Sequence, residues 1–238
     1  MKKLMILATA VAAWSAMALA DVVLIPHGGL TGKQAAKKFT PEAIKQAYDR
    51  KQDRVIMSVD WDGSAFKSRA GAIDMTALFK AAAPKENPFE IVIRAKGDDE
   101  TWFEPLDQAV KAAGLAPSKV RVFARMPWQL APFHAKHPEY ELGLSGDLGM
   151  SEGMAKVKKY AQQGRKLGIK AVIIDHEKAG KGCLSKASIQ LFRDAGMEIR
   201  FWEPGADDAE LKDMLSYEPS AICAVQLANV KKRLAAVK

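Results

Sequence analysis

The chain has 238 residues, enough for one large hydrophobic core, and no linker or low-complexity tract marks a second domain. It carries 36 Lys and Arg residues against 28 Asp and Glu residues, which gives a formal net charge of +8. This excess is spread along the chain and forms no basic stripe interleaved with aromatic residues, so we expect no nucleic-acid partner. The charge is compatible with an anionic small molecule as a partner.

Residues 1–20 have the pattern of a secretory signal peptide. Two lysines give a basic start, a mostly apolar stretch follows, and Ala18-Leu19-Ala20 forms a small-x-small cleavage site. The apolar stretch is short for a membrane span. We therefore expect a mature domain over residues 21–238, no transmembrane anchor, and a periplasmic or secreted location.

The rest of the chain repeats one unit eight times: a short apolar strand, a charged or polar residue where the strand ends, and then a helix. The expected strands are Val22–Ile25, Val55–Val59, Ile91–Ile93, Val120–Ala124, Tyr140–Leu144, Ala171–Ile174, Ile199–Trp202 and Ala221–Val225. Eight alternating units predict an α/β fold, a single-domain (β/α)8 TIM barrel. The alternative is an open, doubly wound sheet. The Gly-rich segment after the first strand does not favour it, because His27-Gly28-Gly29-Leu30-Thr31-Gly32 has neither a dinucleotide fingerprint nor the Lys-Ser/Thr of a P-loop.

Local signals predict where the helices begin and end. Thr40 and Ser151 have the side chains of helix N-caps, and each precedes an amphipathic stretch. Three glycines are expected to end helices: Gly114, Gly168 and Gly196. The fourth helix, at residues 127–136, contains Pro132, which we expect to shorten or distort it.

TIM barrels place their chemistry at the carboxyl ends of the strands, so the residues at those ends are the candidates for a site. They are His27, Asp60, Arg94, Lys96, Arg125, Asp147, the run Asp175-His176-Glu177, Trp202, Glu203 and Gln226. A histidine in this position can act as a general acid or base near neutral pH, which favours a catalytic role for His27.

The charged residues after the second, third and fourth strands allow two interpretations each. Asp60 and Asp62 have oxygen ligands at a spacing that suits Mg²⁺ or Ca²⁺, but Asp-x-Asp-Gly is also a good turn sequence. Arg94, Lys96 and Arg125 could clamp a phosphate or carboxylate, because the Arg donors form a planar fork. Alternatively, they pair with Asp60 and its neighbours.

The second half of the chain offers further candidates. His176 could be a second acid/base group or could open a solvated loop, and Trp202 could be a pocket wall or a core residue. His134 and His137 are three residues apart, a spacing that can chelate a metal, but the flanking prolines favour a helix end at the surface.

The chain has two cysteines, Cys183 and Cys223, and their spacing does not suggest a metal site. An exported protein could join them in a disulfide, or they could remain separate thiols.

These motifs resemble those of the glycerophosphodiester phosphodiesterase family, which shares its barrel with phosphatidylinositol-specific phospholipase C. The resemblance covers essentially the whole mature chain. The matching segments are His27-Gly28-Gly29 for His-Arg-Gly, Pro41-Glu42 for the start of Pro-Glu-Asn-Thr, Ser58-Val59-Asp60 for Glu-x-Asp, Asp62-Gly63 for the Asp-Gly turn, Arg94-Ala95-Lys96 for Glu-x-Lys, and Trp202 at the seventh strand.

The resemblance implies phosphodiester hydrolysis in lipid metabolism, with two histidines as acid and base and Mg²⁺ or Ca²⁺ on three carboxylates. Here Ser58 and Arg94 replace two of those carboxylates, and Gly28 replaces a phosphate-binding arginine. No histidine lies between His27 and His134, so the family's second catalytic histidine is missing. We therefore expect no metal and no other cofactor.

The sequence thus predicts an exported protein that acts on, or recognises, a phosphate-bearing small molecule, with phosphodiester hydrolysis as the reaction if it is an enzyme. The expected catalytic residues are His27 and His176, and the expected substrate-binding residues are Asp60, Arg94, Lys96, Arg125 and Trp202. One alternative is a catalytically inactive barrel that serves as a binding or accessory protein. Another is a different barrel hydrolase that uses Asp60, Asp175 and Glu177.

Overall fold

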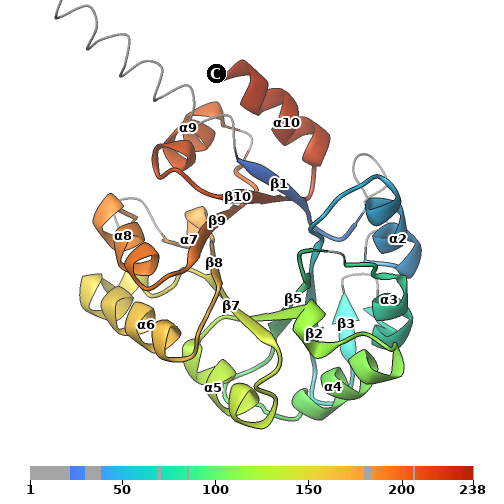
Figure 1. The fold of residues 1–238 in the computed structure, drawn as a ribbon. Coiled ribbons are helices and arrows are strands. Elements are labelled where there is room, and N and C mark those ends of the chain that lie inside the picture. Colours follow the sequence, from blue (N-terminus) through green and yellow to red (C-terminus); the bar gives the residue numbers. More distant parts are fainter. Residues whose placement is uncertain are drawn as a thin grey trace, which may run out of the picture.

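The computed structural model describes residues 22–29, 39–68, 71–84, 86–179, 184–205 and 207–237. The strands of this part of the chain form one curled sheet of 10 strands, and the helices surround it (Figure 1). The expected signal peptide at residues 1–20 and Cys183 lie outside the described residues. Cys223 is buried in the last strand of the barrel.

Eight of the strands are parallel and form the barrel wall. They are β1 (Val23–Pro26), β2 (Ile56–Trp61), β5 (Phe89–Arg94), β6 (Val120–Ala124), β7 (Glu141–Gly146), β8 (Ala171–Ile174), β9 (Glu198–Trp202) and β10 (Ala221–Ala224). Each overlaps the range expected from the sequence, and their order around the ring is β1-β10-β9-β8-β7-β6-β5-β2. The predicted TIM barrel is therefore confirmed.

The ring closes between β1 and β2 through a short contact at His27. This residue forms a single parallel bridge with Ile56, and the amide of Gly28 donates to the Ile56 carbonyl at 2.8 Å. On its other side, the amide of His27 donates to the Ala224 carbonyl of β10, also at 2.8 Å. The backbone of His27 is thus held by both neighbouring strands at the joint that closes the barrel.

The helices pack on the outer face of the sheet, and the main hydrophobic core fills the layer between them. They are α2 (Pro41–Asp49), α3 (Met75–Ala81), α4 (Phe103–Ala112), α5 (Pro127–Lys136), α6 (Met154–Lys166), α7 (His176–Ala179), α8 (Lys186–Asp194), α9 (Asp208–Ser216) and α10 (Leu227–Ala236). Fully buried side chains such as Phe133 and Tyr160 anchor this layer. Each contributes about 1.5–3 kcal/mol through removal of its apolar surface from water.

The helix ends partly follow the sequence signals. Thr40 caps α2, since its Oγ1 accepts from the Ala43 amide at 3.2 Å. The cap expected at Ser151 is wrong, because Gly153 at φ +93° precedes α6 and Ser151 lies in a short 3₁₀ turn. The three helix-ending glycines have the expected positive φ angles: Gly114, Gly168 and Gly196. Helix α5 runs through Pro132 over its whole expected range, so the proline does not shorten it.

A hairpin not expected from the sequence extends the sheet beyond β2. It consists of β3 (Phe66–Ser68) and β4 (Gly71–Ala72), both antiparallel to their neighbours. Asp62 forms the turn that starts it, with Oδ1 accepting from the amides of Ser64 and Ala65 at 2.9 Å each. Hydrogen bonding by Lys67 and by these amides holds the pKa of Asp62 well below its usual range. The turn interpretation of Asp62 is therefore the one that the structure supports.

Charged side chains near the starts of the strands fill the lower end of the barrel. We call this set the lower charge layer: Arg54, Glu90, Arg121, Glu141, Glu198 and Arg200. Its centre is Glu90, fully buried, whose carboxylate lies 2.6 Å from Arg200 Nη1 and 2.9 Å from Arg121 Nη1. Burial disfavours the charged form of Arg200, but Glu90 raises the pKa of Arg200 above its ordinary value. The buried charges of this layer thus compensate one another.

Candidate active site

A cavity of about 560 Å³ lies at the opposite end of the barrel, where the strands end. Its lining includes His27, Ser58, Arg94, Arg125, Trp128, Gln129, Ser145, Asp175 and Trp202. Below it, Phe123 is fully buried, and Gly143 on the neighbouring strand leaves room for the Phe123 ring. A Cβ at position 143 would lie 2.2 Å from that ring, which explains the glycine.

Four side chains of the lining form what we call the mouth layer: His27, Ser58, Ser145 and Trp202. Nε2 of His27 lies 3.0 Å from Ser58 Oγ, and the imidazole ring lies 4.9 Å from the ring of Trp202. Trp202 is held in turn, because its Nε1 donates to Ser145 Oγ at 3.1 Å. Both serines are buried, with exposed fractions of 5% and 8%. The mouth layer therefore places an acid/base group and two hydroxyls on the cavity.

The loop that follows His27 is pressed against the start of α2. Gly29 has a φ of +89°, and a Cβ on it would lie 2.5 Å from the Ala43 carbonyl group. Only glycine fits this close approach at a positive φ. Phe39, which comes just before α2, packs edge-on against the His27 ring at 5.2 Å. The backbone of His27 is thus held by hydrogen bonds, and Phe39 and Trp202 pack against its imidazole.

Arg94 and Asp60 form a bidentate ion pair at the rim. Arg94 Nε and Nη2 donate to the two carboxylate oxygens of Asp60 at 2.7 and 2.9 Å, and both side chains are about half exposed. Arg94 lines the cavity, whereas Asp60 is not among its lining residues. The structure therefore shows the ion-pair alternative for Arg94, with Asp60 as its partner.

Arg125 reaches the same cavity from the end of β6. Its exposed side chain passes beside Gly146, where a Cβ would lie 3.4 Å from Arg125 Cγ. Arg94 and Arg125 are thus two guanidinium groups on one cavity, an arrangement suited to a phosphate or carboxylate.

His176 does not line the cavity of His27, which corrects the expectation that it is the second acid/base group there. Residue 176 is the first of α7, and its ring points to α9. Nδ1 lies 3.2 Å from Glu210, and Nε2 lies 2.9 Å from Asp213. The histidine belongs to a neighbouring cavity of about 370 Å³ that shares only Asp175 and Trp202 with the first.

Other strand-end candidates also lie outside the cavity. Lys96 is exposed and lies beyond the end of β5. Strand alternation therefore does not determine the direction of its side chain. Asp147 accepts from the Gly149 amide and the Ser151 hydroxyl, so it shapes the loop after β7. Glu203 accepts from the backbone amides of Val225 and Gln226 and thereby holds the turn before α10.

The alternative hydrolase site based on three carboxylates is not assembled. Asp175 lines the cavity of His27, but Asp60 is bound to Arg94, and Glu177 lines only the neighbouring cavity.

The residues at the family's metal-binding positions do not fit a divalent cation. Ser58 is hydrogen-bonded to His27, Arg94 is a fixed positive charge, and the carboxylate of Asp60 is bound on both oxygens by Arg94. A hard cation needs several oxygen ligands and would have to displace this guanidinium. No step of the chemistry below is therefore assigned to a metal.

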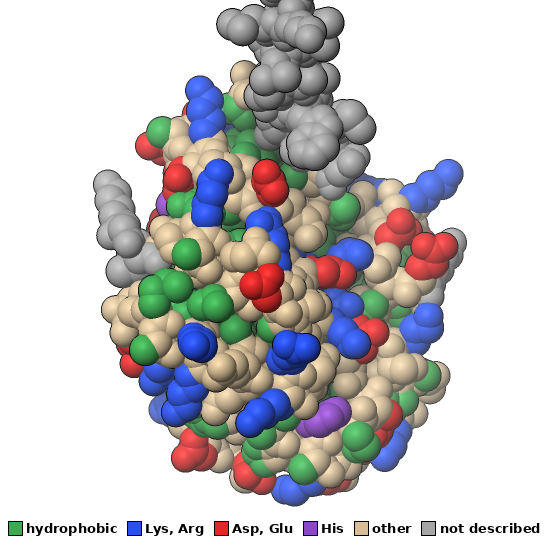
Figure 2. All heavy atoms as spheres, turned by 60° about the vertical axis from the view of Figure 1, so that its left-hand side comes forward, with side chains coloured by type: hydrophobic (Ala, Val, Ile, Leu, Met, Phe, Trp, Pro, Cys, Tyr) green, Lys and Arg blue, Asp and Glu red, His purple; other side chains and the backbone are tan. Residues whose placement is uncertain are grey.

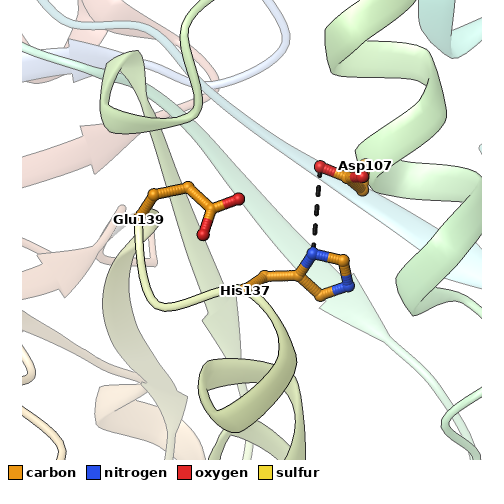
Figure 3. Close-up of side chains that lie close together, drawn as sticks. All are labelled: Asp107, His137 and Glu139. Carbon is orange, nitrogen blue, oxygen red and sulfur yellow. Dashed lines mark ion pairs between the residues drawn. The ribbon is translucent and has the colours of Figure 1, made fainter.

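A second group of possible metal ligands lies away from the mouth, among α4, the end of α5 and the turn after it (Figure 3). The ligand atoms of Asp107, His137 and Glu139 lie within 4.8 Å of one another. The Asp107 carboxylate, however, already accepts from Tyr140 at 3.0 Å and pairs with Lys111 at 2.6 Å. We therefore regard this group as a structural contact between the helices. His134 is not a member of this group.

On the face drawn in Figure 2, positive charge is spread out, as the sequence suggested. In Figure 2, which brings the side of α6 forward, Lys and Arg side chains are scattered with Asp and Glu among them. Four basic residues of α6 are exposed: Lys158, Lys159, Arg165 and Lys166.

The sequence reasoning missed the two serines of the mouth layer. In the sequence, Ser58 stands out only as the replacement of a glutamate, and Ser145 belongs to no motif. Both are buried in the barrel wall and line the cavity. Only the strand register, which pairs Ser58 with Val92 and Ser145 with Ile173, reveals their place.

Known structures share this fold. A protein from Galdieria sulphuraria, named as a candidate glycerophosphodiester phosphodiesterase, is similar with a TM-score of 0.68 at 12% identity over 90% of this chain and 98% of the other. A glycerophosphodiester phosphodiesterase from Parabacteroides distasonis gives 0.65 at 12% identity over 91% and 98%. One from Agrobacterium tumefaciens gives 0.52 at 12% identity over 88% and 99%.

Neither a protein-family model nor a curated protein sequence matches this chain. The structural neighbours establish that the chain has a glycerophosphodiester phosphodiesterase-like TIM barrel, and the resemblance noted in the sequence is confirmed at the level of fold. One barrel fold hosts many activities, so the function is argued from the site. Within the described residues, no helix has the length and apolar character needed to span a membrane.

Proposed function

We propose that this protein binds a phosphate-bearing small molecule in the cavity of His27 and hydrolyses a phosphodiester bond there without a divalent cation. The observation that carries the proposal is the meeting of His27 with Arg94 and Arg125 on one cavity at the carboxyl end of the barrel. In this proposal His27 transfers the proton, and the two guanidinium groups stabilise the negative charge that develops on the phosphoryl oxygens.

The cavity also suits the size of such a substrate. About 560 Å³ lies within the range of small-molecule sites, and Trp202 and Trp128 offer apolar walls for the organic part. Asp175 lines the same cavity. Its carboxylate would repel a second anionic group, so the proposal favours a diester with one negative charge.

The test is an assay of the purified mature protein on a panel of phosphodiesters, with and without EDTA. We expect turnover of at least one diester, unchanged by EDTA, and its loss in His27→Ala. If no diester is hydrolysed but phosphate esters bind, and Arg94→Ala abolishes that binding, the barrel is a binding or accessory protein. Activity that requires an added divalent cation would contradict the proposed metal-free site.

We also propose that the protein is exported and that residues 1–20 are removed. The leader ending in Ala18-Leu19-Ala20 supports this. The intact mass of the protein recovered from the periplasm or the medium should correspond to a chain that begins at Asp21. Retention of the leader in a membrane fraction would contradict the proposal.

A further inference from the structure

We propose that Ser58 is a catalytic nucleophile and that His27 is its general base, so that the phosphoryl group is carried transiently on Ser58 Oγ. The inference rests on the proposed phosphodiester hydrolysis and gives that site its mechanism. The pair has the required geometry, because Oγ of Ser58 lies 3.0 Å from Nε2 of His27 and both residues line the cavity.

The fold holds this pair in place. His27 forms its bridge with Ile56, which is two residues before Ser58 on β2. Side chains alternate along a strand, so Ile56 and Ser58 face the same side, the barrel interior. Both are buried, and the imidazole is enclosed by Phe39 and Trp202. The joint that closes the barrel thus also fixes the hydroxyl beside the imidazole.

A covalent route also accounts for the single histidine on the cavity. Direct attack by water would need a base for the water and a separate acid for the leaving alcohol. Since His176 faces α9, no second histidine among the described lining residues can take either role. A serine nucleophile divides the reaction into two steps, and His27 can serve as base and then as acid within each of them.

In the first step, neutral His27 accepts the Ser58 hydroxyl proton on Nε2 while Oγ attacks phosphorus. The bond from phosphorus to the leaving oxygen breaks, and this oxygen takes the proton from Nε2. In the second step, His27 accepts a proton from water, the water oxygen attacks phosphorus, and the Oγ–phosphorus bond breaks. Ser58 then recovers its proton from His27. The net reaction is a diester and water giving a monoester and an alcohol.

The mouth layer offers an internal control for this assignment. Ser145 is also buried and also lines the cavity, but the partner of its Oγ is Trp202, whose indole Nε1 donates to it. The two serines therefore share burial and cavity and differ in the contact with His27. A reagent that reacts with activated serines should therefore modify Ser58 and not Ser145.

Diisopropyl fluorophosphate tests the pair directly, because it forms an Oγ–phosphorus bond and releases fluoride at an activated serine. We expect one label per chain, located at Ser58 by peptide mass mapping, in the presence of EDTA. His27→Ala should slow labelling at least about 100-fold, the usual scale for the loss of a general base. Ser145 of the same, unsubstituted protein should remain unlabelled. Absence of label, label on another residue, or unchanged labelling in His27→Ala would overturn the proposal.

A second measurement separates this inference from the proposed function. With bis(p-nitrophenyl) phosphate, the unsubstituted protein should release p-nitrophenolate, and Ser58→Ala should not. If Ser58→Ala hydrolyses this diester at the unsubstituted rate, the nucleophile is refuted and the proposed function stands. If Ser58 is labelled but no diester is hydrolysed, the pair stands and the proposed function fails. The peptide map of the unsubstituted protein shows whether Ser58 is the labelled nucleophile, and this result does not require any variant to fold.

Discussion

The two ends of the barrel interior use polar residues in opposite ways. In the lower charge layer, Glu90 and Arg200 are fully buried ionic side chains that meet at 2.6 Å. In the mouth layer, the polar contacts join an imidazole with a hydroxyl at 3.0 Å and an indole N–H with a hydroxyl at 3.1 Å. The ion pair of Arg94 with Asp60 lies at the rim, where both side chains are about half exposed.

This difference separates the residues that stabilise the barrel, in the lower charge layer, from those that can contact a ligand, in the mouth layer. Charges that neutralise one another inside the protein leave nothing for a ligand to bind, and breaking such a pair leaves an uncompensated buried charge. Hydroxyls and an imidazole around a cavity remain available to a ligand that enters it. In TIM barrels, residues at the lower face serve stability, and those at the carboxyl face of the strands serve chemistry.

The largest expected effect is on stability, from the substitution Glu90→Gln in the lower charge layer. It leaves Arg200 and Arg121 without their central carboxylate, and we expect a loss of about 3–5 kcal/mol in the free energy of unfolding. Urea unfolding followed by circular dichroism measures this loss. The matched control is Glu100→Gln, which breaks an exposed pair with Lys136 and should cost at most about 1 kcal/mol. Equal losses in the two variants would refute the role of the lower layer.

The next effect is on rate, from His27→Ala in the mouth layer. Loss of the proton-transfer group should lower kcat for a phosphodiester by at least about 100-fold, which corresponds to about 2.7 kcal/mol. Steady-state kinetics on the diester identified in the panel measures it. A rate within a few-fold of the unsubstituted protein would remove His27 from the mechanism.

A smaller effect is expected on binding, from Arg125→Ala. A hydrogen bond to a charged group contributes about 1.5–3 kcal/mol, so the affinity for a phosphate monoester should fall about 10- to 100-fold. Isothermal titration calorimetry at fixed ionic strength measures the affinity. Lys166→Ala removes the same charge from the exposed surface of α6 and serves as the control. If the two variants weaken binding equally, the effect is one of net charge and not of the cavity.

The pH dependence of stability should also originate in the lower layer. Burial opposes ionisation of Glu198, yet Arg200 and Arg54 lower the pKa of Glu198 below its ordinary value of 4.5. Its contribution to stability is therefore present above about pH 4.5 and is lost as the pH falls through the lowered folded-state pKa. Urea unfolding at a series of pH values should show this decline, and Glu198→Gln should flatten it. If the unfolding free energy of Glu198→Gln falls with pH as steeply as that of the unsubstituted protein, the acid sensitivity originates in other carboxylates.

The smallest expected effect is that of the rim pair on stability and on metal binding. Asp60→Asn should change the unfolding free energy by no more than about 1 kcal/mol, because the pair is half exposed. Millimolar Ca²⁺ should leave the thermal midpoint of both proteins unchanged. A stabilisation by Ca²⁺ that disappears in Asp60→Asn would instead reveal a metal site at the rim.

The sequence predicted the barrel well because each strand is a buried apolar run followed by helix signals. It also predicted that His27, Arg94 and Arg125 share one cavity, because the carboxyl ends of parallel strands meet there. The sequence did not predict correctly where the side chains of Lys96 and His176 lie relative to this cavity. Both lie just past a strand, where a loop or a new helix, and not strand alternation, sets the direction of the side chain.

Other features depend on contacts that no local pattern contains. Ser58 and Ser145 look like ordinary wall residues until the register places them on the cavity. The ion pair of Arg94 with Asp60 joins positions 34 residues apart, and that of Arg200 with Glu90 joins positions 110 residues apart. The hairpin of β3 and β4 is too short to show a periodic pattern.

The most direct test of the difference between the two ends measures rate and stability together on His27→Ala and Glu90→Gln. We predict a crossed result: His27→Ala loses the phosphodiesterase rate and keeps its thermal midpoint, whereas Glu90→Gln loses stability and keeps its rate per folded molecule. If His27→Ala keeps the rate, or if Glu90→Gln loses the rate while it remains folded, the assignment of chemistry to the mouth and of stability to the lower end is contradicted.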